Sequence, residues 1–269
     1  MIIDFHTHVF PDKIAQKTID HLTAISNNKP FSNGSVDGLL SEMERAGVEI
    51  SISHPVMTSP SQFDSVTRFA SEVNVRFENS TPKIISFAGI HPLCENIEEK
   101  MNYIKECGFK GVKIHPDYQG TFITDESYGK IFECAERLGL IVITHAGVDG
   151  AYRDTATKCT PAMAKEIIDR YPNLKLVLAH YGSNEMFDEV EEILCGERIY
   201  FDTAYILRYI GKEKFIKILE KHGADRILFA SDTPWSGIKE DVDIIRSFGL
   251  DKVTEQKIFC DNARALLGI

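Results

Sequence analysis

Leu140-Ile141-Val142-Ile143-Thr144-His145 is a short apolar run that ends in a histidine, and the same arrangement recurs along the chain. Seven of the nine histidines lie at or just past the end of such a run, and two later runs end in Asp202 and Asp232. Short apolar runs bounded by turn residues are typical of buried parallel strands. Histidines scattered through a core would not all lie at the same end of successive strands, so the pattern indicates an enzyme site.

Segments with helical spacing of apolar residues separate these runs. One of them has the i, i+3, i+4, i+7 spacing of an amphipathic helix, at Val66, Phe69, Ala70 and Val73. Strands that alternate with helices predict a parallel sheet, and eight such units predict an α/β fold, the (β/α)₈ (TIM) barrel, with its site at the carboxyl ends of the strands. The predicted strands are residues 2–5, 49–53, 83–88, 111–114, 140–144, 174–179, 198–201 and 226–230.

The domain organisation predicted from the sequence is simple. No linker, low-complexity tract or break in composition divides the chain, so we expect one domain over residues 1–269. Two connections, residues 26–35 and 146–160, exceed the usual length of about two to six residues. The second directly follows the fifth predicted strand, so it is expected to lie over the site.

Composition and charge exclude several classes of partner. The net charge of −10 disfavours a nucleic acid, which normally requires a basic surface. The six cysteines are dispersed without a Cys-x-x-Cys pair, which indicates reduced thiols. No signal peptide pattern and no apolar run near the ~20 residues of a membrane helix is present. We therefore expect a cytoplasmic enzyme with a small-molecule substrate and no membrane or nucleic-acid partner.

The first predicted strand ends in two histidines that can share one ion. Side chains alternate along a strand, so His6 and His8 point to the same side. Two imidazoles held two residues apart on one strand can bind a single divalent ion. The alternative is a pair of ordinary histidines in a turn. Asp4 shares their side and could orient one of the rings.

His145, His180 and Asp232 follow later strands in the same way. A lone histidine after a strand is more often a hydrogen-bonded core residue than a metal ligand. Two of them at the same end of separate strands favour a common site instead. A carboxylate such as Asp232 after an apolar strand is costly to bury unless it is paired or binds a metal.

The chain resembles the amidohydrolase superfamily, in particular the branch of hydrolases and decarboxylases similar to aminocarboxymuconate semialdehyde decarboxylase. The resemblance covers nearly the whole chain and rests on the motifs DFHTH (4–8), GVKIHP (111–116), THAG (144–147), LAHYG (178–182) and SDTP (231–234). It implies one divalent ion, Zn²⁺ first and Mn²⁺ as the alternative, held by His6, His8, His145 and Asp232. His180 would then contact the metal-bound water or the substrate.

The chemistry of these residues agrees with that assignment. Such an ion keeps a position for water, whose pKa falls toward ~7. Asp232 can accept a proton from this water, and His180 can act as an acid or base, so both are predicted to be catalytic. Lys113 is expected to line the pocket as a cation for a substrate carboxylate or enolate. A carbamylated Lys113 that bridges two ions, as in two-metal members of the superfamily, is the less favoured alternative.

Five other side chains are candidates for binding the substrate or lining its pocket. His115 shares the side of Lys113, and His54 and His91 either form pocket walls or end their strands in His-Pro turns. Arg153 could bind a substrate carboxylate or could simply be solvated. Trp235 could form an aromatic wall or pack the loop. Asp202, at the end of the seventh strand, could be a partner of a ligand histidine.

These residues predict a metal-dependent hydrolase of a small amide, lactone or ester, with metal-activated water as the nucleophile. The alternative is a nonoxidative decarboxylase or hydratase of an aromatic or dienoic carboxylate, because the same metal site serves both reactions. A metal-dependent nuclease is a third hypothesis, which the acidic charge disfavours. A non-enzymatic barrel would have no use for a complete ligand set. Barrels of this kind are commonly homo-oligomers, so we include a homo-oligomer among the expectations.

Overall fold

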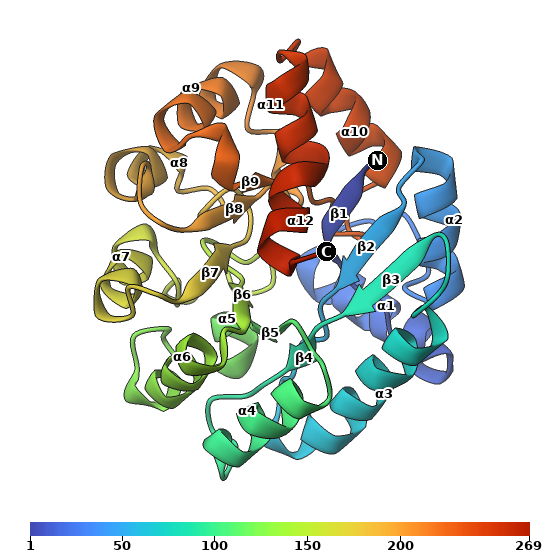
Figure 1. Ribbon diagram of the computed structural model, residues 1–269, viewed down its shortest axis with the longest axis vertical. Helices are drawn as coiled ribbons and strands as arrows, with labels where there is room; N and C mark the ends of the chain where they lie inside the picture. Colours follow the sequence, from blue (N-terminus) through green and yellow to red (C-terminus); the bar gives the residue numbers. More distant parts are fainter.

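The computed structural model describes residues 1–269, and its strands lie at the centre with the helices around them (Figure 1). All neighbouring strands run parallel. The strands are β1 (Ile3–Thr7), β2 (Ile50–Ser53), β3 (Lys83–Ser86), β4 (Ala88–Gly89), β5 (Gly111–Ile114), β6 (Ile141–Thr144), β7 (Lys175–Leu178), β8 (Tyr200–Asp202) and β9 (Ile227–Leu228).

The strands form two arcs, β1-β2-β3 and β4-β5-β6-β7-β8-β9, which together make one ring. β3 and β4 are two parts of a single strand, divided only at Phe87. At the other junction, Phe5 N donates to Phe229 O at 2.8 Å and Asp232 N donates to His6 O at 2.8 Å, which joins β1 to the segment after β9. The eight predicted strands are therefore all present, and the predicted (β/α)₈ barrel is confirmed.

Alternation along the strands separates two apolar cores. Ile141 and Ile143 of β6 belong to a cluster inside the ring, whereas Val142 between them belongs to the larger cluster between strands and helices. Leu266 and Leu267 extend the inner cluster at the bottom of the ring. They belong to α12, the red helix that crosses the centre of Figure 1.

The predicted helices are present with small shifts at their ends. Thr160 caps α7 by accepting a hydrogen bond from Met163 N, and Gly139 ends α6 in the left-handed conformation. A single-turn helix, α5, was not predicted. The helices are α1 (Asp12–Ser26), α2 (Val36–Ala46), α3 (Phe63–Arg76), α4 (Ile97–Glu106), α5 (Pro116–Gln119), α6 (Glu126–Leu138), α7 (Pro161–Arg170), α8 (Phe187–Glu189), α9 (Lys212–His222), α10 (Ile238–Ser247), α11 (Lys252–Gln256) and α12 (Asn262–Leu267), with short 3₁₀ and π turns between some of them. None of these helices is long and apolar enough to cross a lipid bilayer.

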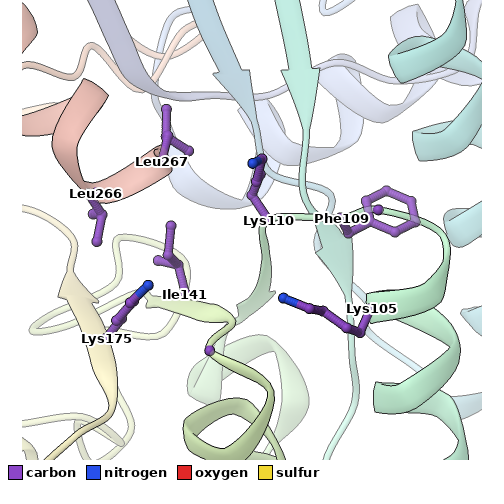
Figure 2. Close-up of a pocket in the computed structure, with 9 residues that line it drawn as sticks. Lys105, Phe109, Lys110, Ile141, Lys175, Leu266 and Leu267 are labelled. Atoms are coloured by element: carbon purple, nitrogen blue, oxygen red, sulfur yellow. The ribbon is translucent and has the colours of Figure 1, made fainter. Parts of the chain in front are cut away.

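A pocket of about 370 Å³ lies at the amino ends of the strands (Figure 2). Three lysines, Lys105, Lys110 and Lys175, surround an apolar floor that includes Ile141 and Leu267. Lys105 lies in the last turn of α4, where a cation offsets the partial negative charge of a helix carboxyl end. None of the predicted site residues lines this pocket, which lies at the end of the barrel opposite to them.

Candidate metal centre

The predicted histidines and aspartates gather at the carboxyl ends of the strands. His6 lies on β1, His145 directly follows β6, and Asp202 is the last residue of β8. His180 and Asp232 lie in the turns that follow β7 and β9. All five side chains are buried, so their hydrogen-bond partners are protein groups rather than water.

One ring nitrogen of His6 carries a proton, and the other presents a lone pair. Its Nδ1 lies 2.8 Å from Asp202 Oδ2, and a carboxylate accepts, so Nδ1 carries the proton and Nε2 keeps its lone pair. Asp202 is itself held by His180 N at 2.9 Å and by Ala204 N at 3.1 Å, both of which donate to Oδ1. Asp202 therefore orients His6, a role for which Asp4 was also considered. Asp4 instead accepts hydrogen bonds from Ser231 N and Oγ, at 3.0 and 2.6 Å.

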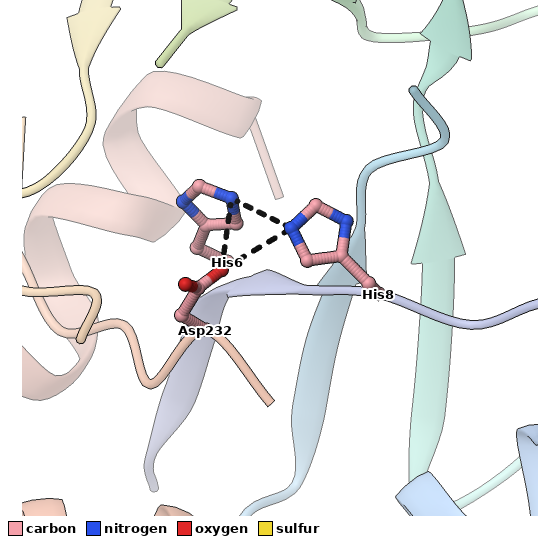
Figure 3. Close-up of side chains that lie close together, drawn as sticks. All are labelled: His6, His8 and Asp232. Atoms are coloured by element: carbon pink, nitrogen blue, oxygen red, sulfur yellow. Dashed lines mark hydrogen bonds and ion pairs between the residues drawn. The ribbon is translucent and has the colours of Figure 1, made fainter. Parts of the chain in front are cut away.

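His8 repeats this arrangement. Its Nδ1 lies 2.7 Å from the carbonyl oxygen of His54, which can only accept, so His8 Nε2 is also free. The two Nε2 atoms are 3.2 Å apart, and Asp232 Oδ1 lies 3.2 Å from His8 Nε2 and 3.6 Å from His6 Nε2 (Figure 3). Three acceptors that converge in this way repel one another unless a cation lies among them. The donor set of two imidazoles and one carboxylate fits a divalent ion.

Lys113 supplies a positive charge beside these acceptors. Its side chain is 1% exposed, and its Nζ lies 3.0 Å from His6 Nε2. Burial lowers the pKa of Lys113 to about 8, and the carboxylates of Asp202 and Asp232 oppose that shift. The ammonium thus holds the lone pair that an ion would bind, and an ion at His6 Nε2 would take its place.

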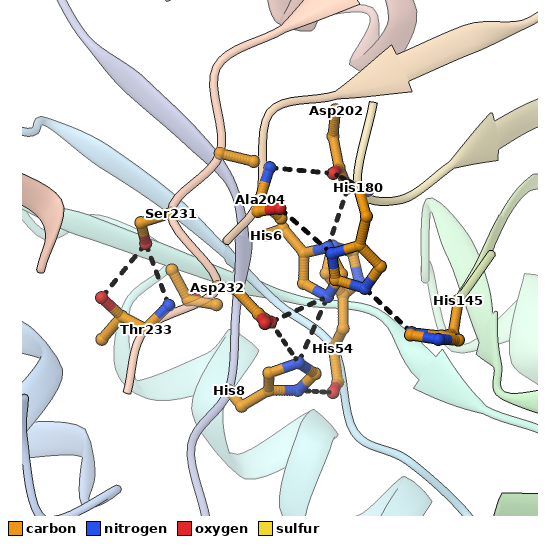
Figure 4. A network of polar contacts seen from close by, with 12 residues as sticks. His6, His8, His54, His145, His180, Asp202, Ala204, Ser231, Asp232 and Thr233 are labelled. Carbon is orange, nitrogen blue, oxygen red and sulfur yellow. Dashed lines mark hydrogen bonds and ion pairs between the residues drawn. The ribbon is translucent and has the colours of Figure 1, made fainter. Parts of the chain in front are cut away.

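His180 and His145 form the next part of the network (Figure 4). His180 Nδ1 lies 3.0 Å from the carbonyl oxygen of Ala204, so it carries the proton and Nε2 is free. His145 Nδ1 lies 2.9 Å from this Nε2. Burial holds the pKa of His145 well below its usual value, so the ring is neutral at pH 7.

The structure divides the potential ligands into two groups, each with its ligand atoms within 4.8 Å of one another. The first group brings together three of the four residues predicted as ligands, His6, His8 and Asp232. His145, predicted to join them, falls in a second group with His115 and Asp149. Its part in binding the same ion therefore stays a prediction. Asp149 was not predicted, although it lies four residues after His145 in the long loop on this face.

The side chains predicted to bind the substrate differ in the protein groups that they already contact. His54 Nε2 lies 2.7 Å from Phe5 O, and His91 Nδ1 accepts from Leu93 N at 3.2 Å, so each ring is held by a backbone group. His115 stacks on His145 with ring centroids 4.4 Å apart. Arg153 forms an exposed ion pair with Glu185. The Trp235 carbonyl accepts from Arg208 Nη2 at 2.9 Å.

Backbone strain is concentrated at this end of the barrel. His180, Tyr181 and Asp232 have φ values of 61°, 58° and 71°. A non-glycine residue in this region costs on the order of 1 kcal/mol or more and persists only where the surroundings hold it. Hydrogen bonds supply that hold, from Tyr181 N to Asp202 O at 2.7 Å and from Asp232 N to His6 O at 2.8 Å. The strain thus lies where the side chains of His180 and Asp232 must be aimed.

The sequence matches a known family and one relative of known activity. The model of the amidohydrolase family matches residues 3–269. Gamma-resorcylate decarboxylase of Polaromonas sp. strain JS666 is 26% identical over 131 residues, which are 42% of this chain and 40% of that protein. The match therefore spans less than half of that relative's length.

Solved structures show the same fold. A TIM-barrel protein from Bordetella bronchiseptica superposes with a TM-score of 0.77 at 18% identity, over 99% of this chain and 98% of that one. The dihydroxybenzoic acid decarboxylase of Polaromonas sp. JS666, with bound manganese and the inhibitor 2-nitroresorcinol, gives a TM-score of 0.70 at 16% identity, over 99% and 96%.

Proposed function

The chain belongs to the amidohydrolase family, and from this premise we propose that it is a metal-dependent decarboxylase of a small aromatic carboxylate. From the sequence we expected hydrolysis first and decarboxylation as the alternative. Two of the three named proteins, both from Polaromonas, are decarboxylases, and they favour the alternative. The observation that carries the proposal is the convergence of His6 Nε2, His8 Nε2 and Asp232 Oδ1 beside His180.

We assign one divalent ion to His6, His8 and Asp232, with His145 as the further predicted ligand. The manganese of the similar decarboxylase supports Mn²⁺ beside the Zn²⁺ expected from the sequence. A bound ion would supply positive charge for the oxygen atoms of the substrate. The neutral histidines suit this role, because burial keeps the pKa of His6 well below its usual value and leaves its lone pair available.

The remaining chemistry falls to side chains of this chain. Loss of carbon dioxide from an aromatic acid requires a proton on the ring carbon that bears the carboxylate. A C–H bond forms, and the C–C bond then breaks with its electron pair returning to the ring. We assign this proton to Asp232 and to His180, whose Nε2 is free to take it up. The buried Lys113 ammonium suits the negative oxygens of such a substrate.

The test is carbon dioxide release from 2,6-dihydroxybenzoate (gamma-resorcylate). The protein is treated with a chelator, reloaded with Mn²⁺ or Zn²⁺, and assayed for resorcinol and carbon dioxide. We expect ion-dependent turnover that falls at least about 100-fold in Asp232→Asn and His180→Ala. His21→Ala, an exposed histidine on α1, is the matched control. Hydrolysis of a lactone without any carbon dioxide release would contradict the decarboxylase and favour the hydrolase that was expected first from the sequence.

Three expectations from the sequence are kept as proposals. Residues 1–269 form one domain, the chain assembles as a homo-oligomer, and the protein is cytoplasmic. A single cooperative unfolding transition, the mass in solution by light scattering and the cell fraction that contains the protein test them in turn.

A further inference from the structure

Asp149 is a carboxylate near the site for which the proposed reaction gives no role. Its Oδ1 accepts a hydrogen bond from Ala151 N at 2.8 Å, which fixes it in the loop after β6. Its Oδ2 lies 3.5 Å from His115 Nε2 and 3.9 Å from His145 Nε2. The two rings stack with an interplanar angle of 8°, so both present the same edge to Asp149.

The positions of the protons around His145 leave one nitrogen unsatisfied. His180 Nδ1 donates to Ala204 O, so His180 Nε2 has no proton to give. The 2.9 Å contact to this atom then requires the proton of His145 on Nδ1. His145 Nε2 is left bare, buried and without a hydrogen-bond partner, facing a carboxylate. A buried acceptor left in this way costs about 1–3 kcal/mol.

The other tautomer places the proton on Nε2. His145 then points this donor toward Asp149 Oδ2, 3.9 Å away, and its Nδ1 and His180 Nε2 face each other as two lone pairs 2.9 Å apart. That tautomer is favoured once a cation binds Nδ1. His6 and His8 show the same division, with the outer nitrogen on an acceptor and the inner nitrogen free.

We propose that Asp149 is a positioning residue that holds the Nε2 proton of His145 and thereby presents Nδ1 to the metal ion. The proposal rests on the proposed metal centre. Carboxylates that hold ligand histidines in this way typically change metal affinity by about 10–100-fold when removed. His115 also points a proton toward the same oxygen of Asp149, because its Nδ1 accepts from Tyr118 N at 3.4 Å and its proton therefore lies on Nε2.

The test compares Asp149→Ala and Asp149→Asn with Asp154→Ala, a control carboxylate in the same loop that is exposed. The dissociation constant for Mn²⁺ is measured by competition with a chelator. We expect about 10–100-fold weaker binding in Asp149→Ala and a smaller loss in Asp149→Asn, whose amide oxygen can still accept. Asp154→Ala should bind as the wild type does, and thermal melting of the ion-free variants checks that each is folded.

Nitrogen NMR of the Zn²⁺-loaded protein gives a readout that a purely structural role would not move. We expect the His145 proton on Nε2 in the wild type. Unchanged Mn²⁺ affinity in Asp149→Ala, or a proton on Nδ1, would overturn the role of Asp149 while leaving the metal centre intact. Two ions in the wild type and one in Asp149→Ala would overturn it too, by making this group an ion site itself. If the wild type binds no ion, the proposed metal centre itself is wrong.

Discussion

Asp202 is the residue on which the orientation of His6 depends, because one of its oxygens accepts the His6 proton and the other accepts two backbone protons. In Asp202→Asn the amide oxygen can satisfy only one of these two sets. We expect Mn²⁺ affinity to fall by about 10–100-fold and the chain to lose about 1–3 kcal/mol of stability. Chelator competition and urea unfolding of the ion-free protein measure the two effects separately.

The matched control for this substitution is Asp188→Asn, an exposed carboxylate paired with Lys214. An exposed pair contributes little, so its affinity and stability should stay close to the wild type. If Asp202→Asn bound Mn²⁺ as tightly as this control, the orientation of His6 would not depend on the carboxylate. The argument from proton positions would then fail for His6 and, by extension, for His145.

Gly147 joins the loop after β6 to the loop after β7. Its φ is +89°, and an added Cβ would overlap the backbone N and O atoms of Asn184. We expect Gly147→Ala to lose about 2–5 kcal/mol of stability, from overpacking and from the unfavourable φ. Gly150→Ala is the matched control, because the nearest atom to its added Cβ is 3.7 Å away. Urea unfolding of the two variants checks the difference, and equal midpoints would contradict it.

The ion pair between Arg153 and Glu185 bridges the same two loops at the surface. Exposed pairs contribute at most about 1 kcal/mol, so we expect Arg153→Ala and Glu185→Ala to have the same small effect on stability and to change KM less than about fivefold. Steady-state kinetics with an aromatic carboxylate test this. A KM that rises tenfold in Arg153→Ala alone would support the substrate-binding role predicted for Arg153 from the sequence.

The strands could be predicted because their pattern is local. Ile141-Val142-Ile143 alternates between the two cores, and the next residues place a histidine at the end of the strand. The division of the third strand at Phe87 and the single turn of α5 left no such periodic signal. The hydrogen-bond partners of the histidines could not be predicted either, because Asp202 and His6 are 196 residues apart in the sequence. Sequence spacing indicated that the histidines and Asp232 belong to one site. The protons on the ring nitrogens could be placed only from the hydrogen-bond distances in the structure.

The two ends of the barrel differ in their chemistry. The end with the amino termini of the strands carries a pocket of lysines over the apolar residues of α12, whereas the opposite end buries neutral histidines among carboxylates. Burial lowers the pKa of six histidines: His6, His54, His91, His115, His145 and His222. Unfolding below about pH 6.5 therefore takes up protons. These rings contribute stability above that pH, which is lost as the pH falls toward their folded pKa values.

Asp241 has the opposite effect on the pH dependence of stability. Its contribution makes the folded protein less stable as the pH rises. Asp241 is fully buried in α10, and burial raises its pKa to about 8. The Ser236 hydroxyl and, to a smaller extent, Arg208 lower this pKa, while Asp4 and Glu240 raise it. The folded protein thus holds a proton that the unfolded chain releases above about pH 4. Its contribution to stability is complete below that pH and is lost as the pH rises through about 8.

Asp241→Asn keeps the neutral form at every pH and tests this effect. We expect the variant to be more stable than the wild type at pH 8, with a difference that shrinks as the pH falls toward 4. The free energy of unfolding in urea, measured with a chelator at pH 5, 6, 7 and 8, gives the comparison. Asp243→Asn, on the same helix but exposed and paired with Lys239, should follow the wild type at each pH. Parallel curves for Asp241→Asn and the wild type would mean that Asp241 is ionised in the folded protein, and its buried charge would then need a partner.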